Sequence, residues 1–133
     1  MPALQSLVLT DRAATPVNHT FTPRDVKDGT GLVVHSAGVP VGEKKLTVSM
    51  RKSGSKYKGK LTLSVPVVVD QTINGVVTPI VARTAYATLE VQFDDTSSTQ
   101  ERTNLIGMLA SGLATNKVLV HSAFVDLEGV YGS

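Results

Sequence analysis

The sequence predicts an α+β fold in which an antiparallel sheet is followed by two C-terminal helices. Three segments alternate strictly between polar and apolar residues, at Lys45–Arg51, Lys58–Val65 and Thr84–Phe93. A period of two places the polar side chains of each segment on one side of a sheet. After Asp94 the apolar residues recur at helical spacing, and strands that precede helices in the chain are typical of α+β domains.

The composition fits one domain with a modest core. The chain has 133 residues, of which 41% are hydrophobic and only 5% aromatic, so Val, Leu, Ile and Ala must build the core. We expect a single domain over residues 1–133. The absence of cysteine excludes disulfides and thiolate metal sites. No segment approaches the roughly 18 consecutive apolar residues that span a bilayer.

The first third of the chain predicts short strands. Leu4–Leu9 is prone to form a strand, and His19–Thr22 is expected to pair with it in a hairpin that Pro23 ends. Leu32–Ser36 is predicted to be the next strand. The segment Ala37–Gly42 contains Gly and Pro residues and is predicted to be a loop.

Three longer strands follow. Lys44–Arg51 and Tyr57–Val69 are expected to form a hairpin across a short turn, with Pro66 at an edge or a bulge. Asp70–Pro79 offers few anchoring residues and is predicted to be an exposed loop. Ile80–Asp94 is predicted to be the last strand.

Two short helices are predicted after these strands. Ser98–Glu101 has the sequence of a capping box, and apolar residues at helical spacing continue to Leu113. Val118–Leu127 is predicted to be a second amphipathic helix, and Gly129–Ser133 an extended tail. Because two short helices barely cover the apolar face of the sheet, we expect a second copy to lend its own helices in an intertwined dimer.

The polar face of the sheet has the chemistry of a nucleic-acid site. Seven of the 13 Lys and Arg residues fall in one short stretch, namely Lys44, Lys45, Arg51, Lys52, Lys56, Lys58 and Lys60. Cations suit phosphates, hydroxyl groups suit ribose and base edges, and an aromatic ring can stack on an unpaired base. We therefore interpret this face as the floor of an RNA-binding site.

Other functions have less support. His19, His35 and His121 lie on separate segments without metal-ligand spacing, so we expect no metal, no cofactor and no catalytic site. Asp94-Asp95 is better placed for the approach to the first helix than for acid–base catalysis. A cellular single-strand nucleic-acid-binding module of OB-like type is the alternative, although this face offers only Tyr86 and perhaps Tyr57 as aromatic residues. A small hydrolase is a more distant alternative.

The chain resembles the coat proteins of the small single-stranded RNA bacteriophages, the levivirus family, from about Val39 to Tyr131. The resemblance rests on Glu43–Ser49, on Tyr57-Lys58 with the alternation that follows, on Gln71–Val76 with Pro79, on Arg83–Ala87 and on the terminal helix pair. It implies an N-terminal β-hairpin, a five-stranded antiparallel sheet, two C-terminal helices and an interlocked dimer. Dimers would close into an icosahedral shell around single-stranded RNA, with the sheets facing inward.

The resemblance also implies where the RNA binds. The family's operator-binding positions fall on Lys45, Thr47, Ser49, Arg51, Lys58, Lys60, Thr62, Tyr86, Thr88 and Glu90. Lys and Arg would hold phosphates, Thr47 and Ser49 would bind an unpaired base, and Tyr86 would stack on one. The protein would belong to the virion, assemble in the cytoplasm of the bacterial host and repress translation of a viral gene. Loops equivalent to Asp70–Pro79 would cluster at the symmetry axes of the shell.

Overall fold

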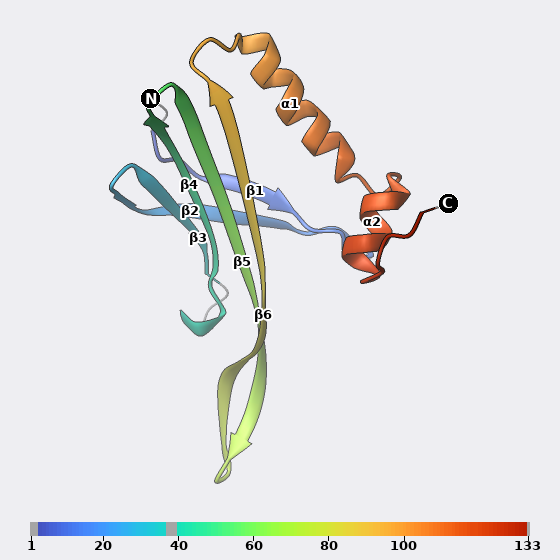
Figure 1. Cartoon of the computed structure of the whole chain (residues 1–133). Coiled ribbons are helices and arrows are strands. Elements are labelled where there is room, and N and C mark those ends of the chain that lie inside the picture. Colours follow the sequence, from blue (N-terminus) through green and yellow to red (C-terminus); the bar gives the residue numbers. More distant parts are fainter. Residues whose placement is uncertain (1–2, 37–39, 133) are drawn as a thin grey trace. The chain divides into compact units, whose positions relative to one another are not determined.

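The computed structural model describes residues 3–36 and 40–132 and confirms the α+β fold (Figure 1). The regular elements are β1 (Leu7–Thr10), β2 (Asn18–Lys27), β3 (Thr30–His35), the 3-10 turn η1 (Pro40–Gly42), β4 (Lys44–Ser53), β5 (Lys56–Ile73), β6 (Val76–Asp94), α1 (Thr99–Gly112) and α2 (Val118–Val125). These residues group into two compact units, Met1–Gln92 with the sheet and Phe93–Ser133 with the helices. Part of the predicted loop, residues 37–39, lies outside the described residues.

The strands form one six-stranded sheet in which each strand lies beside the next in the chain. The predicted N-terminal hairpin is β1–β2, and the predicted five-stranded sheet is β2–β6, so the two share β2 (Figure 1). The first part of β2 pairs with β1, as in Leu7 with Phe21. The second part pairs with β3, beginning at Thr22 with Val34.

Pro23 does not end β2, contrary to the sequence-based expectation. The strand continues to Lys27, and its register with β3 shifts between Pro23 and Asp25. Such an irregularity accommodates a residue that has no backbone N–H for the ladder. The following turn is tight, because Asp28 and Gly29 take φ of 51° and 77° and β3 begins directly after them.

The predicted loop at Asp70–Pro79 is wrong. β5 continues to Ile73 and β6 begins at Val76, so only Asn74 and Gly75 connect them. Their φ values are 52° and 79°. Positive φ at both central residues marks the type I′ turn, whose twist matches that of the strands it joins and which favours Asn-Gly. The resulting β5–β6 ribbon extends past the ends of β3 and β4 (Figure 1).

Pro66 lies inside β5, but its missing backbone N–H removes no hydrogen bond from the pairing of β4 with β5. The last residue of β5 that pairs with β4 is Ser64, opposite Lys45. The position two residues further along is therefore beyond the β4 ladder, in agreement with the expected edge position.

The helices begin and end for identifiable reasons. The Oγ of Ser98 accepts a hydrogen bond from the Glu101 N–H at 3.2 Å, which confirms the predicted N-cap. Before it, the carbonyl of Asp94 accepts from the Ser97 N–H at 3.0 Å, in the approach to α1. α2 ends two residues before the predicted boundary at Leu127, whose φ of 59° is incompatible with a right-handed helix. Neither helix is long and apolar enough to cross a membrane within the described residues.

The core of the sheet unit lies on one face. Phe21, Val33 and Leu46 form its buried centre, and partly buried leucines pack around them: Leu4, Leu9, Leu61 and Leu63. Leu4 approaches the backbone so closely that a Cβ at Gly31 would lie 2.9 Å from its Cδ1. A residue with a side chain at this position would require the Leu4 side chain to shift.

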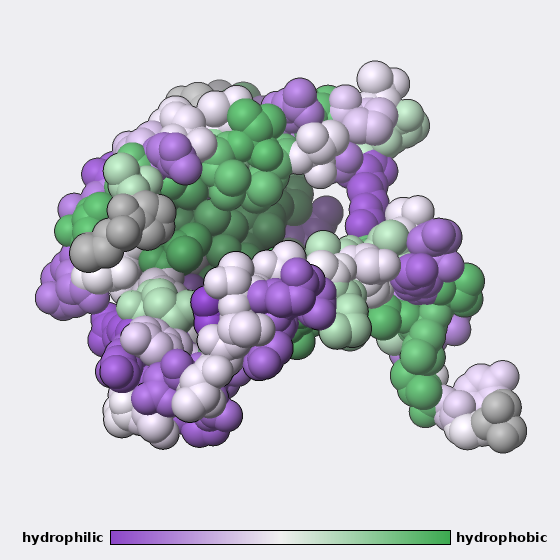
Figure 2. All heavy atoms as spheres, turned by 90° about the horizontal axis from the view of Figure 1, so that it is seen from above, coloured by the Kyte–Doolittle hydropathy of each residue, from purple (hydrophilic) through white to green (hydrophobic). Residues whose placement is uncertain are grey.

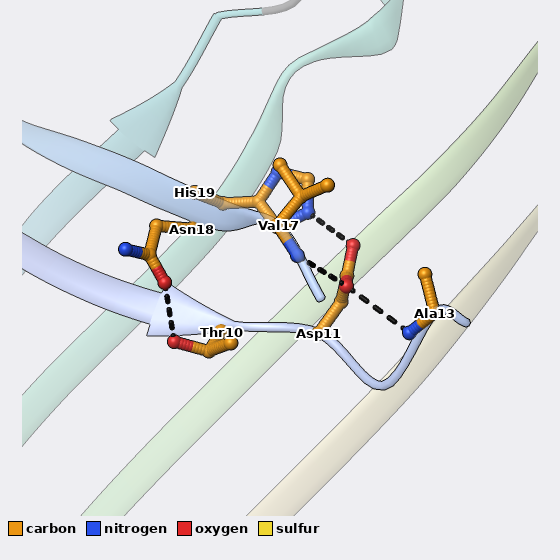
Figure 3. Close-up of polar contacts among 6 residues, drawn as sticks. All are labelled: Thr10, Asp11, Ala13, Val17, Asn18 and His19. Atoms are coloured by element: carbon orange, nitrogen blue, oxygen red, sulfur yellow. Dashed lines mark hydrogen bonds and ion pairs between the residues drawn. The ribbon is translucent and has the colours of Figure 1, made fainter. Parts of the chain in front are cut away.

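A hydrogen-bonded turn joins β1 to β2 (Figure 3). The Oδ1 of Asp11 accepts from the N–H groups of Val17 at 3.0 Å and Ala13 at 3.2 Å. Its Oδ2 lies 2.8 Å from Nε2 of His19. The Val17 N–H, followed by the His19 side chain and the Ala13 N–H, lowers the pKa of Asp11 from 3.8 to about 2.

This lowered pKa predicts how the turn responds to acid. The carboxylate stabilises the folded hairpin fully above the unfolded pKa of 3.8 and loses this contribution as the pH falls toward about 2. We expect an NMR titration of the Asp11 carboxyl group to give a midpoint near 2. In Asp11→Ala, the Val17 amide should exchange rapidly throughout this pH range. A wild-type midpoint near 3.8 would contradict the turn described here.

Candidate nucleic-acid interface

The register between β4 and β5 confirms one polar face. The paired residues on this face are Lys45 with Ser64, Thr47 with Thr62, Ser49 with Lys60 and Arg51 with Lys58. Side chains of directly paired residues lie on the same side of a sheet, so the two polar series meet. The residues between them, such as Val48 opposite Leu61, lie on the other face.

All of the paired residues on the polar face except Lys45 and Ser64 line a broad depression of about 800 Å³. Its lining residues are Thr30, Thr47, Ser49, Arg51, Ser53, Lys58, Gly59, Lys60, Thr62, Glu90, Val91 and Gln92. Seven of the ten predicted site residues are therefore gathered in one place. Lys45, Tyr86 and Thr88 are not among the lining residues.

Two contacts order the polar groups in the depression. The hydroxyl groups of Thr47 and Thr62 are hydrogen-bonded to each other across β4 and β5. Nη2 of Arg51 donates to the backbone carbonyl of Asp28 at 3.0 Å, which ties this cation to the β2–β3 turn. Hydroxyl groups and cations are thus presented together on a rigid sheet.

Tyr86 lies further along β6. Its side chain is exposed, with 80% of the residue accessible to solvent. It is four residues before Glu90 in the same strand, and a period of two places both on one face. An exposed ring at this position is available for stacking on a base.

Five lining residues were missed by the sequence-based prediction: Thr30, Ser53, Gly59, Val91 and Gln92. Thr30 belongs to β3 and enters the depression because it pairs with Ser49. Ser53 continues the polar series of Lys45–Arg51 by one further step of two residues, a signal that could have identified it, and Gln92 belongs to the polar series of Thr84–Phe93 although it was not predicted as a site residue. β3 also contributes apolar residues to this face, since Leu32 pairs with Thr47.

The register divides the basic cluster between the two faces. Lys52 pairs with Tyr57, and both lie on the face opposite the depression. The Lys52 ammonium lies 5.5 Å from the centre of the Tyr57 ring. Tyr57 was considered as a second aromatic residue of the polar face, and this assignment is wrong.

The histidines are less scattered than their sequence positions indicate. The rings of His19 and His35 meet edge to face, with their centroids 5.0 Å apart. Nδ1 of His35 lies 3.1 Å from the carbonyl oxygen of Thr20, and its ring also lies beside Phe21. Within residues 3–36 and 40–132, no group of three His, Cys, Asp or Glu side chains could hold a metal ion.

Many hydrophobic residues remain exposed in the single chain. Only Phe21, Val33, Val34 and Leu46 are buried hydrophobic residues in the described part of the sequence, and neither helix has a buried residue. Exposed apolar side chains include Val48, Met50 and Leu89 in the sheet unit and Ile106, Met108, Leu119 and Phe124 in the helical unit. Figure 2 shows contiguous hydrophobic residues open to solvent.

Comparisons with known proteins agree on one family. The family model described as "Levivirus coat protein" matches residues 2–131. The capsid protein of Pseudomonas phage PRR1 is 54% identical over 129 residues, which cover 96% of this chain and 98% of that protein.

Solved structures show the same fold. The capsid protein of bacteriophage GA superposes with a TM-score of 0.83 at 28% identity, covering 97% of this chain and 98% of that one. A chain of the virus-like particle of bacteriophage NT-214 superposes with a TM-score of 0.84 at 20% identity, covering 98% of this chain and 100% of that one. A structure named as an unassembled virus coat protein dimer and bacteriophage RNA-binding dimer superposes with a TM-score of 0.68 at 24% identity. The match covers 97% of this chain and 98% of that one.

Proposed function

Because this chain belongs to the levivirus coat protein family, we propose that it assembles as dimers into an icosahedral shell around single-stranded RNA. The inward face of the sheet binds an RNA hairpin, through which the protein packages the viral genome and represses translation of a viral gene. Assembly takes place in the cytoplasm of the bacterial host, and the protein is a component of the virion. The two compact units act together as one coat-protein domain, and we expect neither enzymatic activity nor a cofactor.

The depression on the sheet is the main observation that supports RNA binding. It combines three cations, at Arg51, Lys58 and Lys60, with the hydroxyl groups of Thr and Ser residues. The cations attract phosphates without regard to sequence. In this proposal Thr47 and Ser49 hydrogen-bond an unpaired base, and the exposed ring of Tyr86 stacks on a base beyond the depression. Lys45, Thr62, Thr88 and Glu90 complete the proposed site.

The free edge of β6 and the exposed apolar residues support the proposed dimer. β6 has 19 residues and ends the strand order, so the described sheet leaves one side of it without a neighbouring strand. A long unpaired edge invites pairing with another chain. Pairing of two β6 strands would join two sheets into one surface, with both depressions on the same side, and a partner's helices would cover the apolar residues.

Electron microscopy of the purified recombinant protein tests assembly directly. Closed particles of uniform size that contain RNA are the expected result. A cellular nucleic-acid-binding module would give a monomer or a small oligomer, and that result would refute the proposed shell.

The β5–β6 ribbon is predicted to influence particles more than dimers. Deletion of two residues from each strand would join Gln71 to Thr78 through the same Asn74-Gly75 turn and preserve the alternation of faces. The deleted residues would be Thr72, Ile73, Val76 and Val77, all of which are exposed. We expect folded dimers with altered particle size or particle stability, measured by light scattering and thermal melting. Particles identical to wild type would show that the ribbon makes no contact of consequence in the shell.

Lys60→Ala is predicted to weaken RNA binding without changing the preference for sequence. Loss of one phosphate contact should reduce the affinity for all RNA about equally and lower the salt dependence by roughly one ion. Filter binding at several salt concentrations measures both quantities. Lys52→Ala is the matched control, since this lysine lies on the opposite face. Equal effects of the two substitutions would contradict the assigned face.

A further inference from the structure

Glu90 is the only acidic residue among the described residues that line the depression. The charged groups around it are Arg51, Lys58 and Lys60. A carboxylate cannot donate a hydrogen bond to a phosphate and repels it. Its presence on a surface suited to phosphate therefore requires an explanation.

Oε1 of Glu90 lies 4.0 Å from Nζ of Lys60. Lys60 pairs on its other side with Ser49 of β4, so the lysine lies between a hydroxyl group and the carboxylate. The side chains of Lys60 and Glu90 remain 55% and 73% exposed. An exposed ion pair of this kind is weak and opens readily, so an arriving phosphate can compete for the ammonium group.

We propose that Glu90 is a positioning residue that competes with RNA phosphate for Lys60. The carboxylate holds the ammonium group when RNA is absent and must release it when a phosphate binds. Every RNA that uses Lys60 meets this competition, whatever its sequence. Glu90 therefore sets the strength of RNA binding and does not read a base. This inference rests on the proposed RNA-binding function.

Glu90→Gln is the direct test, because it removes the charge and keeps the size of the side chain. The probes are a 20-nucleotide poly(U) strand and the hairpin that the wild-type protein selects from a library with randomised loops. We expect affinity to rise about two- to fivefold for both probes, the range that an exposed ion pair provides. The salt dependence should steepen by up to about one ion. Glu90→Asp retains the charge and should bind nearly as the wild type does.

A double-mutant cycle shows whether Glu90 acts through Lys60. In the Lys60→Ala background, Glu90→Gln should have little further effect on either probe. A gain that persists in this background would overturn the inference, as would an unchanged affinity in Glu90→Gln alone. Selective loss of hairpin binding would also overturn it, because a base contact would then explain Glu90.

Two controls separate this inference from the function on which it rests. Glu128→Gln removes the same charge from the exposed tail and should leave binding unchanged. Sedimentation confirms that each variant retains the dimer of the wild type. If the wild-type protein binds neither probe at low salt, the proposed function fails and this inference fails with it. If the wild-type protein binds RNA but Glu90→Gln binds it no more tightly than Glu90→Asp does, only the inference fails.

Discussion

Replacement of Leu109 by aspartate is expected to eliminate the soluble dimer. Leu109 is half-buried in α1, and α1 also exposes the neighbouring apolar residues Ile106 and Met108. In the proposed dimer these residues lie against the partner, together with Leu105, Phe124 and the sheet residues Leu61, Leu89 and Val91. An aspartate there would bury a charge without a partner, which costs several kcal/mol.

Analytical ultracentrifugation and circular dichroism measure this outcome. The variant is expected to aggregate or to sediment as a poorly folded monomer. Thr103→Asp is the matched control, because it introduces the same charge on an exposed position of the same helix. A wild-type protein that remains a well-folded monomer at micromolar concentration would disprove the dimer.

Tyr86→Ala is expected to cause the largest loss of hairpin binding among single substitutions on the polar face. Stacking of a base on an aromatic ring contributes about 1–3 kcal/mol, so the affinity should fall by about 5- to 150-fold. A scrambled RNA without a suitably placed unpaired base should lose much less. The dimer should remain intact, since Tyr86 is 80% exposed and contributes little to the core.

Two further variants show whether the ring itself is responsible. Tyr86→Phe keeps the stacking surface and should retain most of the affinity for the hairpin. Tyr57→Ala removes a tyrosine from the opposite face and should have no effect on RNA binding. Hairpin binding by Tyr86→Ala at the wild-type level would mean that the binding face is assigned wrongly.

The alternation of residues was sufficient to predict the part of the sheet that forms the depression. A period of two determines which side chains share a face, and the pairing of Thr47 with Thr62 confirms that the two series meet. The start of α1 could also be predicted from the sequence, because the Ser98 cap depends on residues close together in the chain.

Features that depend on distant residues could not be predicted in this way. Leu32 shares the polar face only because of the register between β3 and β4, which its own neighbours do not encode. His19 and His35 meet because β2 and β3 are adjacent strands. The end of β2 was misjudged for a different reason, since the register shift beside Pro23 allows the strand to continue.

The two-residue connection at Asn74-Gly75 also limits how the end of the ribbon can move. A two-residue turn with positive φ at both residues favours one conformation, so we expect it to keep that conformation in different surroundings. Copies of the chain in non-equivalent positions of a shell would therefore have to differ by bending the whole ribbon. We expect such bending near Pro66, just beyond Ser64, the last residue of β5 that pairs with β4. The ribbon would then bend as one unit. Its angle to the rest of the sheet would differ between positions in the shell, while the conformation of its turn would stay the same.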